Sequence, residues 1–480
     1  MAKAQPRSGE RGNLRELFQP RSIAVVGASA DSRTQGYRYV RLLLDYGFDG
    51  PVYPVNPNLS QLLGLPCYPS LIHIPGPVDY VISCIPASGV LELVEQCAQK
   101  GVGLIHFFTA RFSETGRQPA AALEQELLAR ARRHHIRLIG PNCIGLYYPR
   151  HGLSFRYNLP RESGPVGLLS QSGGNAALIV QGAGTRGLRF SQVISYGNAL
   201  DINEADLLEH LGADPETRVI GAYIEGVKEG RRFFRTLQQV TPHKPVIVLK
   251  GGRTSPGRRA TQSHTASLAG SEGVWQAMLR QARAVAAADL KELIDLLVTF
   301  AWLPPTCGVR VGIAGGGGGP TVEAADQCHE AGLEVIPLPD DIRGAIKDRA
   351  PLVWDWVGNP ADQSILLQTG IEAEDVLKMM AQSPEFDLLI GNATTDSPFE
   401  PHLEERLLHK ELSAWLEIRR SSSKPLAVVI GATEGSSPWR QQMFTQLQTQ
   451  LGAARIPTYP SMRRAARALS RFIQYHRLNR

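Results

Sequence analysis

The sequence has few cysteines, no long apolar run and no stretch of biased composition. Its six cysteines stand far apart and form no CxxC pair. This argues against a disulfide framework or a metal site and favours reduced thiols in a cytosol. No apolar stretch approaches the roughly 20 residues that a membrane span needs, and the polar residues 1–12 lack the apolar core of a signal peptide. We therefore expect a cytoplasmic protein with no metal site and no membrane contact.

No large patch of one charge is expected either. The 51 Lys and Arg residues and 45 Asp and Glu residues are interspersed and leave a net charge of +6. One dense group of arginines near the C-terminus alternates with apolar residues at helical spacing, which predicts an amphipathic helix with a solvated basic face. The group consists of Arg463, Arg464, Arg467, Arg471, Arg477 and Arg480. Nucleic-acid binding is not expected, whereas a modest positive excess suits a protein that handles phosphates.

The 480 residues contain a repeated pattern of apolar runs and helix-period segments. A chain of this length is typical of two to four domains. Short apolar runs that alternate with helical patterns predict parallel sheets in α/β domains. We expect domains at residues 1–150, 151–305 and 306–480, each with a glycine-rich turn after an early strand. The expected strands are 22–26, 52–55, 80–85, 103–108, 136–139, 166–170, 218–224, 245–249, 309–314, 333–336, 387–390 and 426–430.

The first glycine-rich turn, residues 25–37, follows the first expected strand. A strand that leads through such a turn into a helix gathers backbone N–H groups and the positive end of a helix dipole, which together bind phosphate. The turn lacks G-x-G-x-x-G spacing, and Asn56 rather than a carboxylate follows the second strand. The missing acid argues against NAD and suits coenzyme A, whose ribose phosphate an acid would repel. The alternative is a turn that only joins strand to helix.

The second turn has the sequence SQSGG at residues 170–174. Ser172 stands where a helix N-cap would, and the two glycines after it would let a ligand approach the backbone amides. The alternative interpretation is an ordinary helix cap without a ligand.

The third turn contains five consecutive glycines, 315–319. Such a run costs backbone entropy and implies close backbone approach or unusual dihedral angles. It does not imply chemistry, and we favour a structural role.

A loop rich in Gly, Ser, Thr, Arg and Pro spans residues 251–271 and carries one histidine, His264. Small neighbours on both sides would leave its imidazole accessible, as a histidine that accepts a phosphoryl group requires. A lone loop histidine is otherwise a surface residue, and that alternative stays open here.

At these motifs the sequence resembles the NDP-forming acyl-CoA synthetases, relatives of succinyl-CoA synthetase. The likeness is greatest to the alpha subunit of the acetate–CoA ligase (ADP-forming) type and extends over nearly the whole chain. The matching strings include LFQPRSIAVVGAS (17–29), YPVNPN (53–58), GPNCIG (140–145), GLLSQSGG (167–174), YIEGVKEGRRF (223–233) and SHTASLAGS (263–271). The resemblance implies a Rossmann-like CoA-binding domain followed by two flavodoxin-like, succinyl-CoA synthetase-like domains with parallel sheets.

The resemblance also implies roles for individual residues. His264 matches the histidine that becomes phosphorylated, and Glu225 matches the carboxylate that accepts a hydrogen bond from its ring. Ser172 and Gly173 match the helix N-terminus that holds the phosphate. The residues that match the CoA site are Gly27, Ser29, Arg33, Gly36, Asn56 and, near the thiol end, Asn142. Cys143 lies beside Asn142, and we do not expect it to be a nucleophile.

The implied reaction is acid + CoA + ATP ⇌ acyl-CoA + ADP + phosphate, through an acyl phosphate and a phosphohistidine. No expected domain corresponds to the family's ATP-grasp domain, so the resemblance implies a separate beta subunit that binds Mg-ADP or Mg-ATP, and a hetero-oligomer. The acid is a small carboxylic acid that the sequence does not identify. Ala266 and Arg111 stand where the family usually has glycine. The alternatives are a non-catalytic, CoA-binding regulatory protein and, more weakly, an NAD-dependent oxidoreductase.

Overall fold

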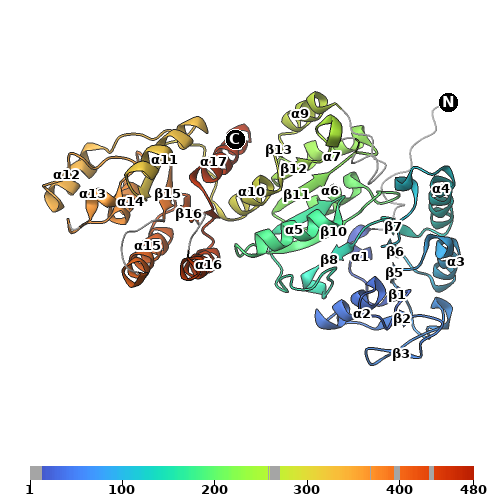
Figure 1. Ribbon diagram of the computed structural model, residues 1–480. Coiled ribbons are helices and arrows are strands. Elements are labelled where there is room, and N and C mark those ends of the chain that lie inside the picture. Colours follow the sequence, from blue (N-terminus) through green and yellow to red (C-terminus); the bar gives the residue numbers. More distant parts are fainter. Residues whose placement is uncertain are drawn as a thin grey trace. The chain divides into compact units, whose positions relative to one another are not determined.

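The structure is a computed structural model that describes residues 13–257, 259, 271–367, 369–393, 401–431 and 437–479 (Figure 1). The chain forms two compact units, which are described separately. The first consists of Met1–Gln181 and Arg189–Leu290, and the second of Gly182–Leu188 and Lys291–Arg480. The first unit holds two large sheets and the second holds one. In the described part of the chain, no helix has the length and apolarity that a bilayer crossing demands.

The first sheet is entirely parallel and has the order β2-β1-β5-β6-β7. Because β1 lies between β2 and β5, the direction of the crossovers reverses at β1, and ligands of such sheets bind at the carboxyl ends of the strands there. The strands are β1 (Ile23–Val26), β2 (Val52–Val55), β5 (Tyr80–Ser83), β6 (Leu104–Phe107) and β7 (Arg137–Ile139). The other elements are α1 (Leu14–Leu17), α2 (Gln35–Asp45), α3 (Val90–Lys100), α4 (Gln118–Arg133) and a hairpin of β3 (Gln61–Leu62) and β4 (Leu65–Pro66).

The second sheet has the order β13-β12-β11-β9-β10-β8. Five strands are parallel, and β8 pairs antiparallel with β10 at the edge. The strands are β8 (Gly145–Tyr147), β9 (Val166–Ser170), β10 (Phe190–Ser195), β11 (Val219–Ile224), β12 (Val246–Lys250) and β13 (Val285–Ala287). The helices of this region are α5 (Gly173–Gly184), α6 (Glu204–Ala213), α7 (Gly230–Val240), α9 (Glu272–Gln281) and α10 (Leu290–Trp302). Here the crossovers reverse at β9, between β10 and β11.

The third sheet is parallel and has the order β14-β15-β16-β17. The expected strand 333–336 forms only a single bridge, Glu334 to Arg310, beside β14; Pro337 follows it and has no N–H for a longer ladder. The strands are β14 (Val311–Gly315), β15 (Leu388–Asn392), β16 (Leu426–Val429) and β17 (Thr458–Tyr459). The helices are α11 (Gly318–Glu330), α12 (Asp340–Arg349), α13 (Gln363–Leu366), α14 (Ala373–Gln382), α15 (Pro401–Ser421), α16 (Pro438–Ala453) and α17 (Met462–Leu478).

The predicted fold class is confirmed: the chain is α/β throughout, with three separate parallel sheets. Except for 333–336, every expected strand overlaps an observed one, because fully buried parallel strands produce continuous apolar runs. The sequence reading did not identify β8, β10, β13 or β17. The domain limits at 150 and 305 stay a prediction; β8 ends at Tyr147 and already belongs to the second sheet.

Five of the C-terminal arginines lie on α17, as the helical spacing predicts, and the sixth, Arg480, lies outside the described residues. The apolar side of this helix is buried, and Arg463, Arg467, Arg471 and Arg477 are exposed. Arg464 is not part of the solvated basic face that the sequence predicts. Its Nε donates to Oδ2 of Asp295 at 2.7 Å, and the same buried carboxylate accepts a hydrogen bond from Arg186 at 2.5 Å. One arginine of the group is therefore part of the interior of the second unit.

Candidate functional site

The turn after β1 contains two glycines, and any other residue at either position would force the neighbouring backbone to move. Gly27 has a φ of 89°, and a Cβ there would lie 2.9 Å from the carbonyl carbon of Cys84. A Cβ on Gly36 would overlap the carbonyl oxygen of Gly27. The first turn of α2 therefore packs directly on the backbone of this turn, and the N–H groups of Gly27 and Ala28 both donate to the carbonyl oxygen of Val55.

The side chains predicted to bind CoA gather around the same turn. Asn56, after β2, donates from Nδ2 to the carbonyl oxygen of Ala28 at 2.6 Å. Ser29 accepts a hydrogen bond from the backbone N–H of Asp31 at 3.1 Å, and the exposed Arg33 pairs with the Asp31 carboxylate at 2.8 Å. The arginine lowers the pKa of Asp31. Sequence reasoning noted the missing acid at position 56 but overlooked this acid within the turn.

Asn142 lies apart from that turn, in the loop that follows β7. It has a φ of 60°, and its N–H donates to the carbonyl oxygen of Thr109 at 2.9 Å. The loop also reaches the second sheet, since the N–H of Ile144 donates to Ser195 Oγ at 3.3 Å. Burial raises the pKa of Cys143 to about 12, so this thiol stays protonated at neutral pH, which argues against a nucleophilic role.

Ser172 and Gly173 form the start of α5, at the carboxyl end of β9. Ser172 Oγ accepts a hydrogen bond from the N–H of Asn175 at 3.3 Å, which is the geometry of a helix N-cap. A Cβ on Gly173 would lie 2.9 Å from Cγ2 of Ile144. The amide-rich helix start thus packs against the loop that carries Asn142, and a phosphate bound there would lie between the two sheets of the first unit.

Glu225 follows β11 directly and is 4% exposed. The hydroxyl of Tyr223 donates to its Oε1 at 3.2 Å. The backbone around it is held by Gln171, whose side-chain oxygen accepts hydrogen bonds from the N–H groups of Glu225 and, at 2.9 Å, of Gly226. Lys250, at the end of β12, donates to the carbonyl oxygen of Glu225 at 2.6 Å. The ends of β9, β11 and β12 therefore fix this carboxylate in place.

The structure brings Glu225 and the Ser172–Gly173 turn to the same edge of the second sheet, because β11 pairs with β9 and Tyr223 lies opposite Ser170. His264 and Ala266 lie outside the described residues. Sequence reasoning missed Gln171, Tyr223 and Lys250 as supports of the site. Gln171 belongs to the SQSGG string, but nothing local shows that its side chain reaches across to β11.

Arg111 lies after β6 and has a φ of 80°, in the left-handed region that favours glycine. Its N–H donates to Glu114 Oε1 at 2.5 Å. The other carboxylate oxygen accepts hydrogen bonds from the N–H of Phe112 at 3.0 Å and from Asn198 Nδ2 at 2.8 Å. An arginine therefore occupies a backbone conformation that suits the glycine usual in the resembled family.

Comparisons with known proteins agree with this architecture. Residues 21–149 match the family described as "CoA binding domain", and residues 163–300 match "Succinyl-CoA ligase like flavodoxin domain". A solved structure of dinucleotide-forming acetyl-coenzyme A synthetase 1 from Ca. Korarchaeum cryptofilum, in complex with phosphate and ADP, superposes with a TM-score of 0.82. It is 31% identical, and the match covers 97% of each chain. These matches place the chain in the class of succinyl-CoA ligase-like proteins.

The curated relatives identify the family within this class of proteins. Subunit alpha of acetate–CoA ligase (ADP-forming) I from Pyrococcus furiosus is 32% identical over 465 residues, which cover 95% of this chain and 96% of that subunit. Subunit alpha of enzyme II from the same organism is 37% identical over 78% of this chain and 81% of that subunit. The chain belongs to the family of ADP-forming acetate–CoA ligases, which are acid–thiol ligases. It spans about half (52%) of the length of another member, acetate–CoA ligase (ADP-forming) II of Archaeoglobus fulgidus, with 36% identity.

Proposed function

We propose that this chain is the CoA-binding, phosphohistidine-bearing subunit of an ADP-forming acyl-CoA synthetase. The observation that carries the proposal is the match over 96% of a relative named as an alpha subunit of such a ligase. It is supported by the buried Glu225 at the sheet edge that also holds Ser172 and Gly173. The substrates are a small carboxylic acid, coenzyme A and the nucleotide, ATP or ADP.

The proposed reaction has three transfers. ATP gives its γ-phosphoryl group to a ring nitrogen of His264 and leaves as ADP. The phosphoryl group then passes to the carboxylate of the acid, which forms an acyl phosphate and restores the imidazole. Finally the CoA thiol, which loses its proton, attacks the acyl carbon, and phosphate leaves as acyl-CoA forms. Positioning and electrostatic stabilisation supply most of the catalysis in phosphoryl transfer.

Each group of residues has one task in this proposal. Glu225 accepts the N–H of one nitrogen of His264, which fixes the tautomer and leaves the other nitrogen as the nucleophile. The Tyr223 hydroxyl donates to that carboxylate, and the side-chain oxygen of Gln171 holds the backbone N–H groups of Glu225 and Gly226. The backbone amides that start α5, at Ser172 and Gly173, bind the transferred phosphoryl group.

CoA binds to the first sheet in this proposal. Its phosphates contact the turn of Gly27 and Ser29, which Gly36 and Asn56 support and to which Arg33 adds positive charge. Its thiol end reaches the loop of Asn142, which packs against the start of α5. The thiol and the phosphoryl group then meet within the first unit.

We also propose that a separate ATP-grasp beta subunit binds Mg-ADP or Mg-ATP, that the two assemble as a hetero-oligomer, and that the enzyme is cytoplasmic. The names of two relatives, which are called alpha subunits, support the first part of this proposal.

The test is phosphorylation of the purified complex, obtained by co-expression with an ATP-grasp subunit from the same genome. With ATP labelled at the γ-phosphate, the wild-type chain is expected to take up one acid-labile label. The His264→Asn variant is expected to take up none, and His243→Asn, at an exposed histidine after α7, serves as the matched control.

Two results would overturn the proposal. Equal label in His264→Asn and wild type would show that another residue carries the phosphoryl group. Tight CoA binding without label in the wild-type complex would instead favour a non-catalytic, CoA-binding regulatory protein on the same scaffold.

A further inference from the structure

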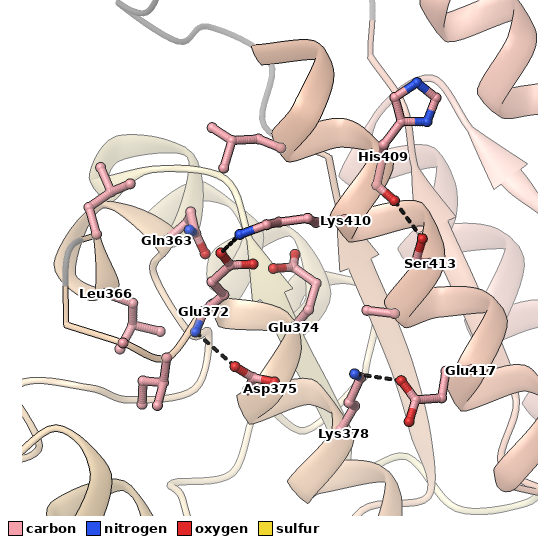
Figure 2. Close-up of a pocket in the computed structure, with 15 residues that line it drawn as sticks. Gln363, Leu366, Glu372, Glu374, Asp375, Lys378, His409, Lys410, Ser413 and Glu417 are labelled. Atoms are coloured by element: carbon pink, nitrogen blue, oxygen red, sulfur yellow. Dashed lines mark hydrogen bonds and ion pairs between the residues drawn. The ribbon is translucent and has the colours of Figure 1, made fainter. Parts of the chain in front are cut away.

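A cavity of about 720 Å³ lies in the second unit, between α13, α14 and α15 (Figure 2). This volume is typical of small-molecule sites. The cavity is distant in sequence from every residue assigned above. One part of its lining is apolar and the other is charged. The apolar residues are Leu366, Leu367, Ile371, Leu407 and Ala414, and the ionisable ones are Glu372, Glu374, Asp375, Lys378, His409, Lys410 and Glu417.

Both lysines of the lining are already paired. Lys410 contacts Glu372 at 2.7 Å, and Lys378 contacts Glu417 at 2.6 Å. Figure 2 shows both pairs as dashed lines. Four carboxylates thus face two ammonium groups, and the excess charge in the cavity is negative. Such a cavity disfavours an anionic ligand and favours a cation.

Of the two remaining carboxylates, Asp375 accepts the N–H of Glu372 at 3.1 Å and lies 3.8 Å from Arg349. Glu374 differs. Its side chain points into the space between α14 and α15 in Figure 2, and it is 4% exposed. Its buried Oε1 has no hydrogen-bond partner in the described parts of the chain. A buried carboxylate oxygen without a hydrogen-bond partner is costly, and native structures pair such atoms almost without exception.

The pKa of Glu374 agrees with this environment. Burial is the largest cause and raises the pKa, while a hydrogen bond to the backbone of Glu374 itself lowers it. The adjacent carboxylates of Glu372 and Asp375 raise the pKa further and Lys378 lowers it, which leaves it raised to about 7. Across the cavity, α15 contributes Lys410, Glu417 and the exposed His409, and α13 contributes the neutral Gln363. When Glu374 is ionised, its buried Oε1 therefore carries negative charge without a hydrogen-bond partner in the described chain.

We propose that this cavity is a binding site for a small organic ammonium ion, whose head group donates to Glu374 and whose alkyl part packs on the leucines. A metal ion is a poorer match. The described residues contain no group of three His, Cys, Asp or Glu side chains arranged to hold one, whereas an ammonium group needs only hydrogen-bond acceptors and its carbon chain uses the apolar wall.

The test uses calorimetric titration of the full chain with three probes that share one alkyl chain: hexylammonium, hexanol and hexanoate. We expect hexylammonium to bind at about 1 mM, and hexanol and hexanoate at least tenfold more weakly. Because Glu374 must be ionised, the affinity for hexylammonium should rise about tenfold between pH 6 and pH 8.

Two variants test whether the carboxylate of Glu374 binds the amine. Glu374→Gln keeps the shape of the side chain and should lose both the affinity, by tenfold or more, and the pH dependence. The matched control is Glu204→Gln, at another buried glutamate with an unpartnered oxygen, in the first unit and outside this cavity; it should bind as the wild type does. A thermal melt of each variant verifies that it is folded.

Three outcomes would overturn the proposal. Absence of hexylammonium binding at pH 8 would mean that Glu374 is only a core carboxyl group that retains its proton. Equal binding by folded Glu374→Gln would place the amine elsewhere, and hexanol binding as tight as hexylammonium would show a purely apolar cavity.

Discussion

The second and third sheets share one local feature but differ in strand order and in chemistry. In the second sheet the crossovers reverse at β9, which lies between β10 and β11, whereas β14 is an edge strand of the third sheet, whose strands follow one another in chain order. In both sheets a glycine-containing turn leads from β9 or β14 into a helix. The strand beside that turn is followed by the buried carboxylate of Glu225 in the second sheet and ends in the amide Asn392 in the third. The side chains beside the two turns therefore decide which chemistry each can perform.

Not every glycine in the turn of the third sheet is required by the local structure. In the third sheet Gly315 has a φ of 101°, and a Cβ there would overlap the carbonyl oxygen of Asn392. Gly316 has a φ of 78° and lies close to the side chain of the same asparagine. Gly317 and Gly319 have no neighbour within 4 Å of a Cβ. Backbone contact thus accounts for Gly315 and a positive φ for both Gly315 and Gly316, which agrees with the structural role expected for the run.

The largest effect is expected at Glu225. If the second sheet carries the phosphohistidine chemistry, Glu225→Gln should slow phosphorylation of the complex by about 100-fold or more, because the neutral amide lacks the negative charge that stabilises the imidazolium character of the histidine. Rapid mixing with labelled ATP measures the rate. Tyr223→Phe removes only the hydroxyl that contacts this carboxylate and should have a smaller effect. An unchanged rate in Glu225→Gln would remove the proposed difference between the two sheets.

The next effect concerns stability. Gly315→Ala should lower the free energy of unfolding by about 3 kcal/mol, because it combines a positive φ with overlap on the backbone. Gly319→Ala, in the same run, has open space around it and should raise stability by about 0.5 kcal/mol. Urea denaturation measures both. Equal effects would contradict the assignment of the run to backbone contact at its first positions.

A third prediction concerns the buried carboxylate of Glu374, whose Oε1 lacks the kind of hydrogen-bond partner that Tyr223 provides for Glu225. The pKa of Glu374 is raised above its usual value of 4.5 to about 7. The folded state therefore holds this proton more tightly than the unfolded state, and stability falls as the pH rises from about 4.5 to about 7. Relative to Glu374→Gln, the wild type should lose roughly 2 kcal/mol over that interval. Denaturation at pH 5 and pH 8 measures the loss, and parallel curves for the two proteins would contradict the environment described for Glu374.

The smallest effect is expected at Arg111. Arg111→Gly should raise the free energy of unfolding by about 0.5–1 kcal/mol, because glycine adopts a φ of 80° without strain. The control is Arg117→Gly, at an exposed arginine whose φ is −88°; it relieves no strain and should not stabilise. Thermal unfolding distinguishes the two, and a stabilisation that is equal at both positions would point to charge rather than backbone conformation.

Much of this protein was predictable from local pattern. The apolar runs located most strands, and the close backbone approach and unusual dihedral angles predicted for the glycine run 315–319 are present at Gly315. The resemblance to ADP-forming acetate–CoA ligases is confirmed by the relatives. Two of the missed strands, β13 and β17, are short, and a run of two or three residues has no detectable periodicity. The missed strand β10 (Phe190–Ser195) is longer, but its sequence FSQVIS is not a continuous apolar run.

The sequence by itself determined the alternation of strands and helices, the glycine turns and the family. Only the tertiary structure decided which distant side chains meet. Strand order in the second sheet brings Gln171, Glu225 and Lys250 together. In the second unit, packing places Asp295 against Arg464 and leaves Glu374 Oε1 without a hydrogen-bond partner among the described residues. The reason is physical: periodicity records which face of an element is buried, whereas the identity of its neighbour depends on the order in which strands pair across a sheet.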